Sequence, residues 1–92
     1  MEKSIFTKDY SLFLAHLRMA RKAAGLTQQE LAHRLGQTQA FVSKCERGER
    51  RIDFAELRAF CHAIGVPVVA FVQGLEDALA QETDAEWTAE RP

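Results

Sequence analysis

The sequence predicts a compact all-α fold of five short helices. Apolar residues recur at helical spacing through most of the 92 residues, and no segment sustains the alternation of a strand. Glycines and capping residues divide this pattern into short segments. At about 100–200 residues per domain the chain forms one domain, and with 47% apolar residues it can bury a core. Only Val66–Val72 is so rich in β-branched residues that a strand is a possible alternative to a helix there.

The first helix is expected over Tyr10–Ala24, after an N-terminal arm of residues 1–9. Leu14 and Leu17 fall on one face of this helix. Gly25 follows at the position where a left-handed residue commonly ends a helix, and an apolar residue comes directly after it.

A capping box at Thr27–Glu30 opens the second helix. In such a box the threonine hydroxyl accepts a hydrogen bond from the glutamate amide, and the glutamate carboxylate accepts one from the threonine amide. The helix is expected to end at Leu35, because Gly36 follows.

The third helix is expected over Gln39–Glu46, with Thr38 as its N-cap and Gly48 as its stop. Two short helices joined by a three-residue turn that contains a glycine have the form of a helix-turn-helix. The second and third helices therefore form a helix-turn-helix at the centre of the chain.

A second capping box, Asp53–Glu56, opens the fourth helix. The apolar residues behind it have the spacing of one buried face: Leu57, Phe60, Cys61 and Ile64. Pro67 suits the first turn of a fifth helix, which is expected to reach about Gln81. Residues 10–81 would then form the folded domain, and the polar, acidic residues 82–92 a flexible tail.

Charge is divided unevenly along the chain. Lys and Arg number 12 against 13 Asp and Glu, and the resulting net charge of −1, taken whole, argues against nucleic-acid binding. Residues 1–74, however, carry 11 basic and 7 acidic side chains, whereas residues 75–92 carry 1 basic and 6 acidic ones. The basic excess therefore lies with the helix-turn-helix, as nucleic-acid binding requires.

Several classes of protein are excluded by the sequence. The longest nearly apolar run, Ala63–Val72, is far shorter than the ~20 residues that span a membrane. The first residues have no apolar signal-peptide core, and two cysteines make no disulfide framework. We therefore expect a cytoplasmic protein with reduced thiols.

The cysteines and histidines do not form a metal-binding motif. Cys45, Cys61 and three histidines lack the paired spacing of zinc ligands, and both cysteines fall on inward faces. A buried thiol is inert as a nucleophile, and no glycine-rich phosphate loop or carboxylate pair stands out. We expect no metal, no cofactor and no enzymatic activity.

A specific pattern runs from Leu17 to Val66. It includes Gly25–Ala32, with its Leu-Thr-Gln opening, and Thr38–Gly48, with its Ser-Lys-x-Glu-Arg-Gly close. Over about fifty residues the chain thus resembles the phage-repressor or Xre (Cro-like) helix-turn-helix family of small DNA-binding transcriptional regulators. It departs from the family pattern at Gln37 and Cys45, where apolar residues are usual, and neither change threatens the fold.

The resemblance and the chemistry of the side chains suggest roles in DNA binding. The third helix would enter the major groove, where a glutamine amide can pair with adenine and an alanine methyl can meet thymine. The candidates for base contacts are Gln39, Ala40, Ser43 and Lys44, with Phe41 at the groove edge or packed inward. The candidates for phosphate contacts are Gln28, Arg21, Arg47, Arg50 and Arg51.

Some of these arginines have structural alternatives. Arg21 also suits an ion pair with Glu30 or Glu46. Arg50 and Arg51 are also typical of a solvated turn.

The fifth helix carries more apolar residues than are needed to cover the first four: Val68, Val69, Phe71, Val72 and Leu75. We expect them to form a homodimer interface, which would place two recognition helices about 34 Å apart on a palindromic operator. The alternative is that they only complete the core. No small-molecule effector is expected for a chain this short.

Three functions remain open. The first is a dimeric transcriptional regulator of double-stranded DNA. The second is an antitoxin-type autoregulator whose acidic segment Glu76–Glu90 binds a toxin. The third is a protein-interaction module with a degenerate helix-turn-helix, which the presence of Gln28, Gln39, Lys44 and Arg47 argues against.

Overall fold

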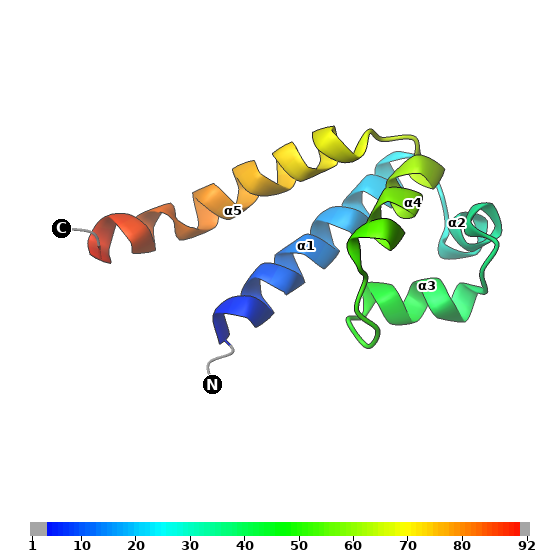
Figure 1. Cartoon of the computed structure of the whole chain (residues 1–92), viewed down its shortest axis with the longest axis horizontal. Helices are drawn as coiled ribbons and strands as arrows, with labels where there is room; N and C mark the ends of the chain where they lie inside the picture. The colour runs from blue at the N-terminus through cyan, green and yellow to red at the C-terminus, as the bar shows by residue number, and fades with distance from the viewer. Residues whose placement is uncertain (1–3, 91–92) are drawn as a thin grey trace.

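The computed structural model describes the backbone of residues 4–90 and the side chains of residues 8–81. The described chain forms five helices and no strand, which confirms the all-α prediction (Figure 1). The helices are α1 (Ser4–Ala23), α2 (Gln28–Leu35), α3 (Gln39–Glu46), α4 (Phe54–Ile64) and α5 (Val68–Glu90).

The first and last helices are longer than the sequence analysis predicts. α1 begins at Ser4 rather than Tyr10, and α5 continues to Glu90 rather than ending near Gln81. Neither extension contains the glycine or proline that would stop a helix, and the second is rich in alanine and glutamate, which favour one. The first three residues of the expected arm and the last two of the expected tail lie outside the described residues.

Side-chain caps fix the starts of α2, α3 and α4. Thr27 Oγ1 accepts from the Glu30 amide at 3.0 Å, while the Thr27 amide donates to Glu30 Oε1 at 2.8 Å. Asp53 and Glu56 form the same reciprocal pair before α4, so both predicted capping boxes are confirmed. Thr38 caps α3 through its side-chain oxygen, also as predicted.

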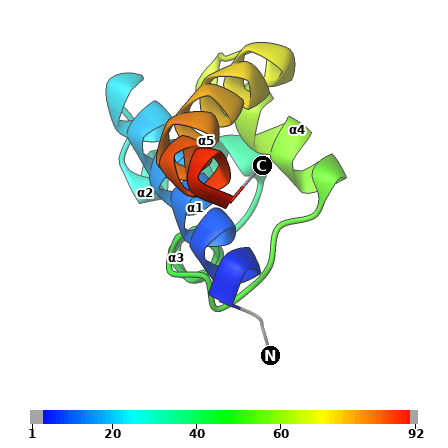
Figure 2. The same ribbon diagram turned by 90° about the vertical axis from the view of Figure 1, so that its left-hand side faces the viewer.

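α1 lies at the centre of the fold. In Figure 1 it runs diagonally, with α5 along one side and α2, α3 and α4 gathered around its C-terminal half, and Figure 2 shows the same arrangement from the end. The core forms where these helices meet. Its fully buried side chains are Leu17, Leu31, Val42, Cys45, Phe60 and Cys61. The short helices of the helix-turn-helix are therefore held in place by packing against α1 and α4.

α5 packs against α1 near its own start and then diverges from it. Phe71 is 4% exposed and lies edge-on to the rings of Phe13 and His16 of α1. A Cβ atom at Gly74 would lie 3.0 Å from His16 Nε2, so the His16 side chain of α1 occupies the space beside this residue. An alanine at Gly74 would require His16 to shift, although a glycine in a helix interior costs about 1 kcal/mol relative to alanine. In Figure 1 the N-terminal end of α1 and the C-terminal end of α5 lie apart.

No single helix among the described residues is both long and apolar enough to cross a membrane. α4 and the first part of α5 reach that length and composition only when taken together, and a bend of 106° lies between them.

Candidate nucleic-acid interface

α3 presents one of its sides to solvent. Its exposed side chains are Gln39, Ala40 and Lys44, and its buried ones are Val42, Cys45 and Glu46. Phe41 and Ser43 are half-buried. The helix lies at the margin of the molecule, at the opposite end from the free end of α5 (Figure 1). Three of the four residues predicted to contact bases are therefore exposed on one side of α3, and Ser43 is half-buried beside them.

A buried ion pair fixes the inner side of α3. Arg21 Nε donates to Glu46 Oε2 at 2.7 Å, and Arg21 Nη2 donates to Glu46 Oε1 at 3.1 Å. The remaining terminal nitrogen of Arg21 donates to the Leu26 carbonyl at 2.8 Å. Arg21 is 6% exposed and Glu46 3% exposed, so the pair is shielded from water. It joins α1 and the turn after it to the C-terminal end of α3.

Two glutamines extend this buried pair to the surface. Gln28 Nε2 donates to Glu46 Oε1 at 2.9 Å, and Gln39 Nε2 donates to Gln28 Oε1 at 2.8 Å. Gln28 is half-buried and Gln39 is exposed. A continuous series of hydrogen bonds thus runs from the interior of the domain to the first residue of α3. We refer to Arg21, Glu46, Gln28 and Gln39 as the relay.

The loop after α3 begins with a second, exposed ion pair. Arg47 Nε and Nη2 donate to the two carboxylate oxygens of Glu49 at 2.9 and 3.1 Å. Arg47 Nη1 also donates to Ser43 Oγ, one turn back on α3. Hydrogen bonding to Arg47 lowers the pKa of the Glu49 carboxyl, and the same bond raises the pKa of Arg47.

Arg50 is held by several groups of the domain at once. Its Nη1 and Nη2 donate to the carboxylate oxygens of Glu56 at 3.0 and 2.8 Å, and Nη1 also donates to the Arg51 carbonyl. Its guanidinium lies 4.9 Å from the centre of the Phe41 ring, which itself packs against Phe60. Arg50 therefore fastens the loop to α3 and α4.

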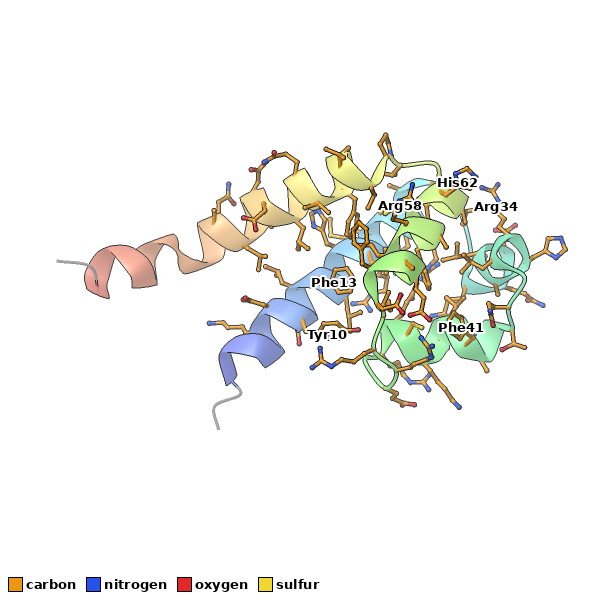
Figure 3. The ribbon with its side chains drawn as sticks, viewed as in Figure 1. Tyr10, Phe13, Arg34, Phe41, Arg58 and His62 are labelled. Atoms are coloured by element: carbon orange, nitrogen blue, oxygen red, sulfur yellow. The ribbon has the colours of Figure 1, made fainter. Side chains whose placement is uncertain are left out.

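Arg51 differs from Arg50 in its partner. Its guanidinium lies 4.3 Å from the centre of the Tyr10 ring, and the Tyr10 hydroxyl accepts from the Ile52 amide at 3.0 Å. Figure 3 shows the rings of Tyr10 and Phe41, which come from α1 and α3. Cation–π contact orients Arg51 without neutralising its charge.

Comparison with known proteins identifies the family. Residues 12–71, well over half of the chain, match the sequence model of a helix-turn-helix domain. The structure is similar to that of an XRE-family like protein from Pseudomonas syringae pv. tomato str. DC3000, with a TM-score of 0.78 and 47% identity over 83% of this chain and 93% of that one. The chain belongs to the Xre-type helix-turn-helix family.

Two solved structures of a more distant protein agree with this family. They are of the clp gene regulator ClgR from Corynebacterium glutamicum, and their TM-scores against this chain are 0.69 and 0.71 at 28% and 27% identity. The first match covers 78% of this chain and 94% of the ClgR chain, and the second covers 88% and 86%, respectively. No curated protein sequence matches the chain. Since the Xre type is a family of DNA-binding transcriptional regulators, α3 is the element that we expect to meet DNA.

Among the residues predicted to contact phosphate, this Xre-type domain places three beside a carboxylate. Arg21 forms the buried pair with Glu46 that the sequence analysis left as its alternative role. Arg47 and Arg50 are paired with exposed and half-exposed glutamates of the loop and of α4. Gln28 belongs to the relay, and Arg51 lies over an aromatic ring.

The residues predicted to form a dimer interface separate into two groups. Phe71 is buried in the core, and Val68 and Leu75 pack against it as half-buried side chains. Val69 and Val72 are 77% and 39% exposed. Only the second group presents an apolar surface to solvent.

Both cysteines are buried free thiols, and burial raises the pKa of each. Arg50, near Cys45, offsets part of that increase. No three His, Cys, Asp or Glu side chains come together as a possible metal site within the part of the chain that the structure describes.

Three glutamates that fix arginines at this site were not predicted as site residues. Glu46 was considered only as an alternative partner of Arg21, Glu56 only as part of a capping box, and Glu49 not as a partner of any arginine. A signal for Glu46 was present, because it lies one position after Cys45 and four after Val42, on the inward side of α3. A carboxylate on that side requires a buried partner. No comparable signal marks Glu49 or Glu56.

Proposed function

We propose that this DNA-binding regulator reads double-stranded DNA sequence-specifically, as a homodimer with one α3 in each of two major grooves. The relay is the observation that supports this most directly. It ties the first residue of α3 to a buried ion pair, so that the exposed Gln39 amide is held at a defined position before any DNA arrives. Groups that are held in place before binding lose less entropy when they bind.

The dimensions of α3 suit the major groove. Eight residues at 1.5 Å each make a helix of about 12 Å, and the major groove of B-DNA is about 12 Å wide. In a helix-turn-helix the N-terminal residues of the second helix meet base edges. Gln39 and Ala40 occupy that end of α3, with Ser43 and Lys44 one turn further along.

Phosphate contacts would flank these base contacts. Two of the predicted residues remain our candidates for phosphate contacts. Gln28 lies at the N-terminal end of α2, where free amides attract anions. The charge of Arg51 has no carboxylate partner among the described residues. The other three arginines form ion pairs with glutamates of the domain: Arg21, Arg47 and Arg50. We expect the protein in the cytoplasm, with the DNA that it binds.

The decisive experiment selects bound sequences from random DNA duplexes and then tests Gln39. Gln39→Ala should weaken binding to the selected site by about 1–3 kcal/mol and relax one base position. Gln29→Ala is the matched control, since Gln29 is an exposed glutamine of α2 outside the relay. Equal losses on selected and random duplexes would contradict the base-reading role of Gln39.

The homodimer is proposed to form through α5, where Val69 and Val72 are exposed. Two copies related by a two-fold axis would place their α3 helices about 34 Å apart, one turn of DNA. Val69→Lys should shift the sedimenting mass from two chains to one and abolish preference for a palindrome. A wild-type protein that sediments as one chain at high micromolar concentration would refute the dimer while leaving α3 as the DNA contact.

A further inference from the structure

Glu49 places a negative charge where it does not favour the stability of α3. The chain turns at Gly48, whose φ of +81° is left-handed, and the Glu49 amide then donates to the Lys44 carbonyl at 2.9 Å. This turn holds Glu49 at the C-terminal end of α3, where the helix dipole favours cations. An acidic residue here needs a reason other than the stability of the helix.

The Glu49 carboxylate is connected to residues on the outer side of α3, the side proposed to meet DNA. Both of its oxygens accept from Arg47, and Arg47 in turn donates to Ser43 Oγ. Lys44 also lies close enough to lower the pKa of Glu49, after the larger effects of Arg47. Ser43, Arg47 and Glu49 thus form a connected set along the outer side of α3, which we call the triad.

The triad contributes little to folding. The side chains of Arg47 and Glu49 are 52% and 55% exposed, and water and salt screen such pairs. The neighbouring pair of Arg50 and Glu56 differs, because Glu56 also completes the capping box of α4 by accepting from the Asp53 amide at 3.0 Å. The effect of Glu49 therefore falls on whatever approaches the outer side of α3.

We propose that Glu49 determines specificity by holding Arg47 on Ser43 and away from the DNA phosphates. Non-specific DNA binding comes almost entirely from Lys and Arg contacts with phosphate, so an arginine occupied by a carboxylate weakens it. The same arginine occupies an acceptor site of Ser43 Oγ, which leaves the hydroxyl hydrogen to donate to an acceptor on a base edge. The inference rests on the proposed function, since it assumes that α3 meets DNA.

The test compares Glu49→Gln with Glu76→Gln by titrating each protein with a random-sequence duplex at several salt concentrations. Glu76 is an exposed residue of α5, a helix that packs against α1 and α4, and its variant changes the net charge equally. Glu49→Gln should raise random-duplex affinity by about five- to tenfold per protomer at 0.1 M salt, relative to Glu76→Gln. It should also steepen the slope of log K against log salt by about 0.9 per protomer, the value for one added phosphate contact. Circular dichroism establishes that both variants are folded.

A charge-neutral double variant separates this role from a phosphate contact by Arg47 in the wild type. Arg47→Gln combined with Glu49→Gln should keep the wild-type salt slope on random duplex and lose preference for the selected site, because Ser43 is no longer held. A slope shallower by about 0.9 in the double variant would show that Arg47 already contacts phosphate, and would overturn the proposal. Identical slopes for Glu49→Gln and Glu76→Gln would overturn it as well. If the wild type binds neither random nor selected duplex, the proposed function itself fails.

Discussion

Two arginine–carboxylate pairs meet at the C-terminal end of α3, one on each side of the helix. Arg21 and Glu46 are buried and join α1 to α3, whereas Arg47 and Glu49 are more than half exposed and join residues two apart. Glu46 and Arg47 are neighbours in the chain, yet one points inward and the other outward. The difference shows that one kind of ion pair fixes the position of a helix when buried, and adjusts the charge of a surface when exposed.

The largest effect is expected from breaking the buried pair. Glu46→Ala leaves the Arg21 guanidinium buried without its carboxylate partner and also removes the acceptor of Gln28. Loss of one partner of a buried ion pair costs about 3–5 kcal/mol of unfolding free energy. Chemical denaturation followed by circular dichroism measures it.

The control for this variant replaces both partners. Arg21→Met combined with Glu46→Leu removes the buried charges together and should destabilise the domain much less than Glu46→Ala alone. A double variant as unstable as the single one would mean that the pair contributes through hydrogen bonds to Leu26 and Gln28 rather than through charge compensation.

A smaller loss is expected at the start of α2, which carries Gln28 of the relay. Thr27→Ala removes the oxygen that accepts from the Glu30 amide and should lower the unfolding free energy by about 1 kcal/mol. Gln29→Ala, in the same turn, removes no side-chain hydrogen bond to another described residue and should change stability by less than about 0.5 kcal/mol. Equal losses for the two variants would rule out the cap as the cause.

The two buried thiols, Cys45 and Cys61, should make the unfolding free energy depend on pH in the alkaline range. Burial raises the pKa of Cys45 and Cys61 in the folded state, so above the ordinary thiol pKa of about 8.5 the unfolded chain loses protons that the folded chain keeps. The stabilisation that the two buried thiols provide is therefore complete below that pH, and it is lost as the pH rises toward their pKa values in the folded state. Denaturation at pH 7 and 9.5 should show a decrease in the wild type. A decrease of the same size after replacement of both cysteines by alanine would contradict this account.

The smallest effect is expected from the exposed pair. Arg47→Gln breaks the contacts with Glu49 and Ser43 and should change the unfolding free energy by less than about 0.5 kcal/mol. The measurement is the same denaturation curve. A loss close to that of Glu46→Ala would remove the distinction between the two pairs.

Much of the helix-turn-helix was predictable because its signals are local. The caps at Thr27, Thr38 and Asp53 each involve an amide three residues further along, so neighbouring residues alone decide where α2, α3 and α4 begin. The outer ends of α1 and α5 were not predictable in this way. No glycine or proline lies within the added segments, residues 4–9 and 82–90, and the apolar spacing fades before the helix does.

The sequence by itself therefore determined the helical class, the three capped helices and the outward side of α3, since backbone propensity and hydrogen bonds within one turn are sufficient for these. Only the tertiary structure decided that Arg21 meets Glu46, 25 positions away, that Gln28 meets Gln39, and that Phe71 faces the core. Such contacts depend on how whole helices pack, because packing sets which polar groups lose water and must find a partner inside the fold.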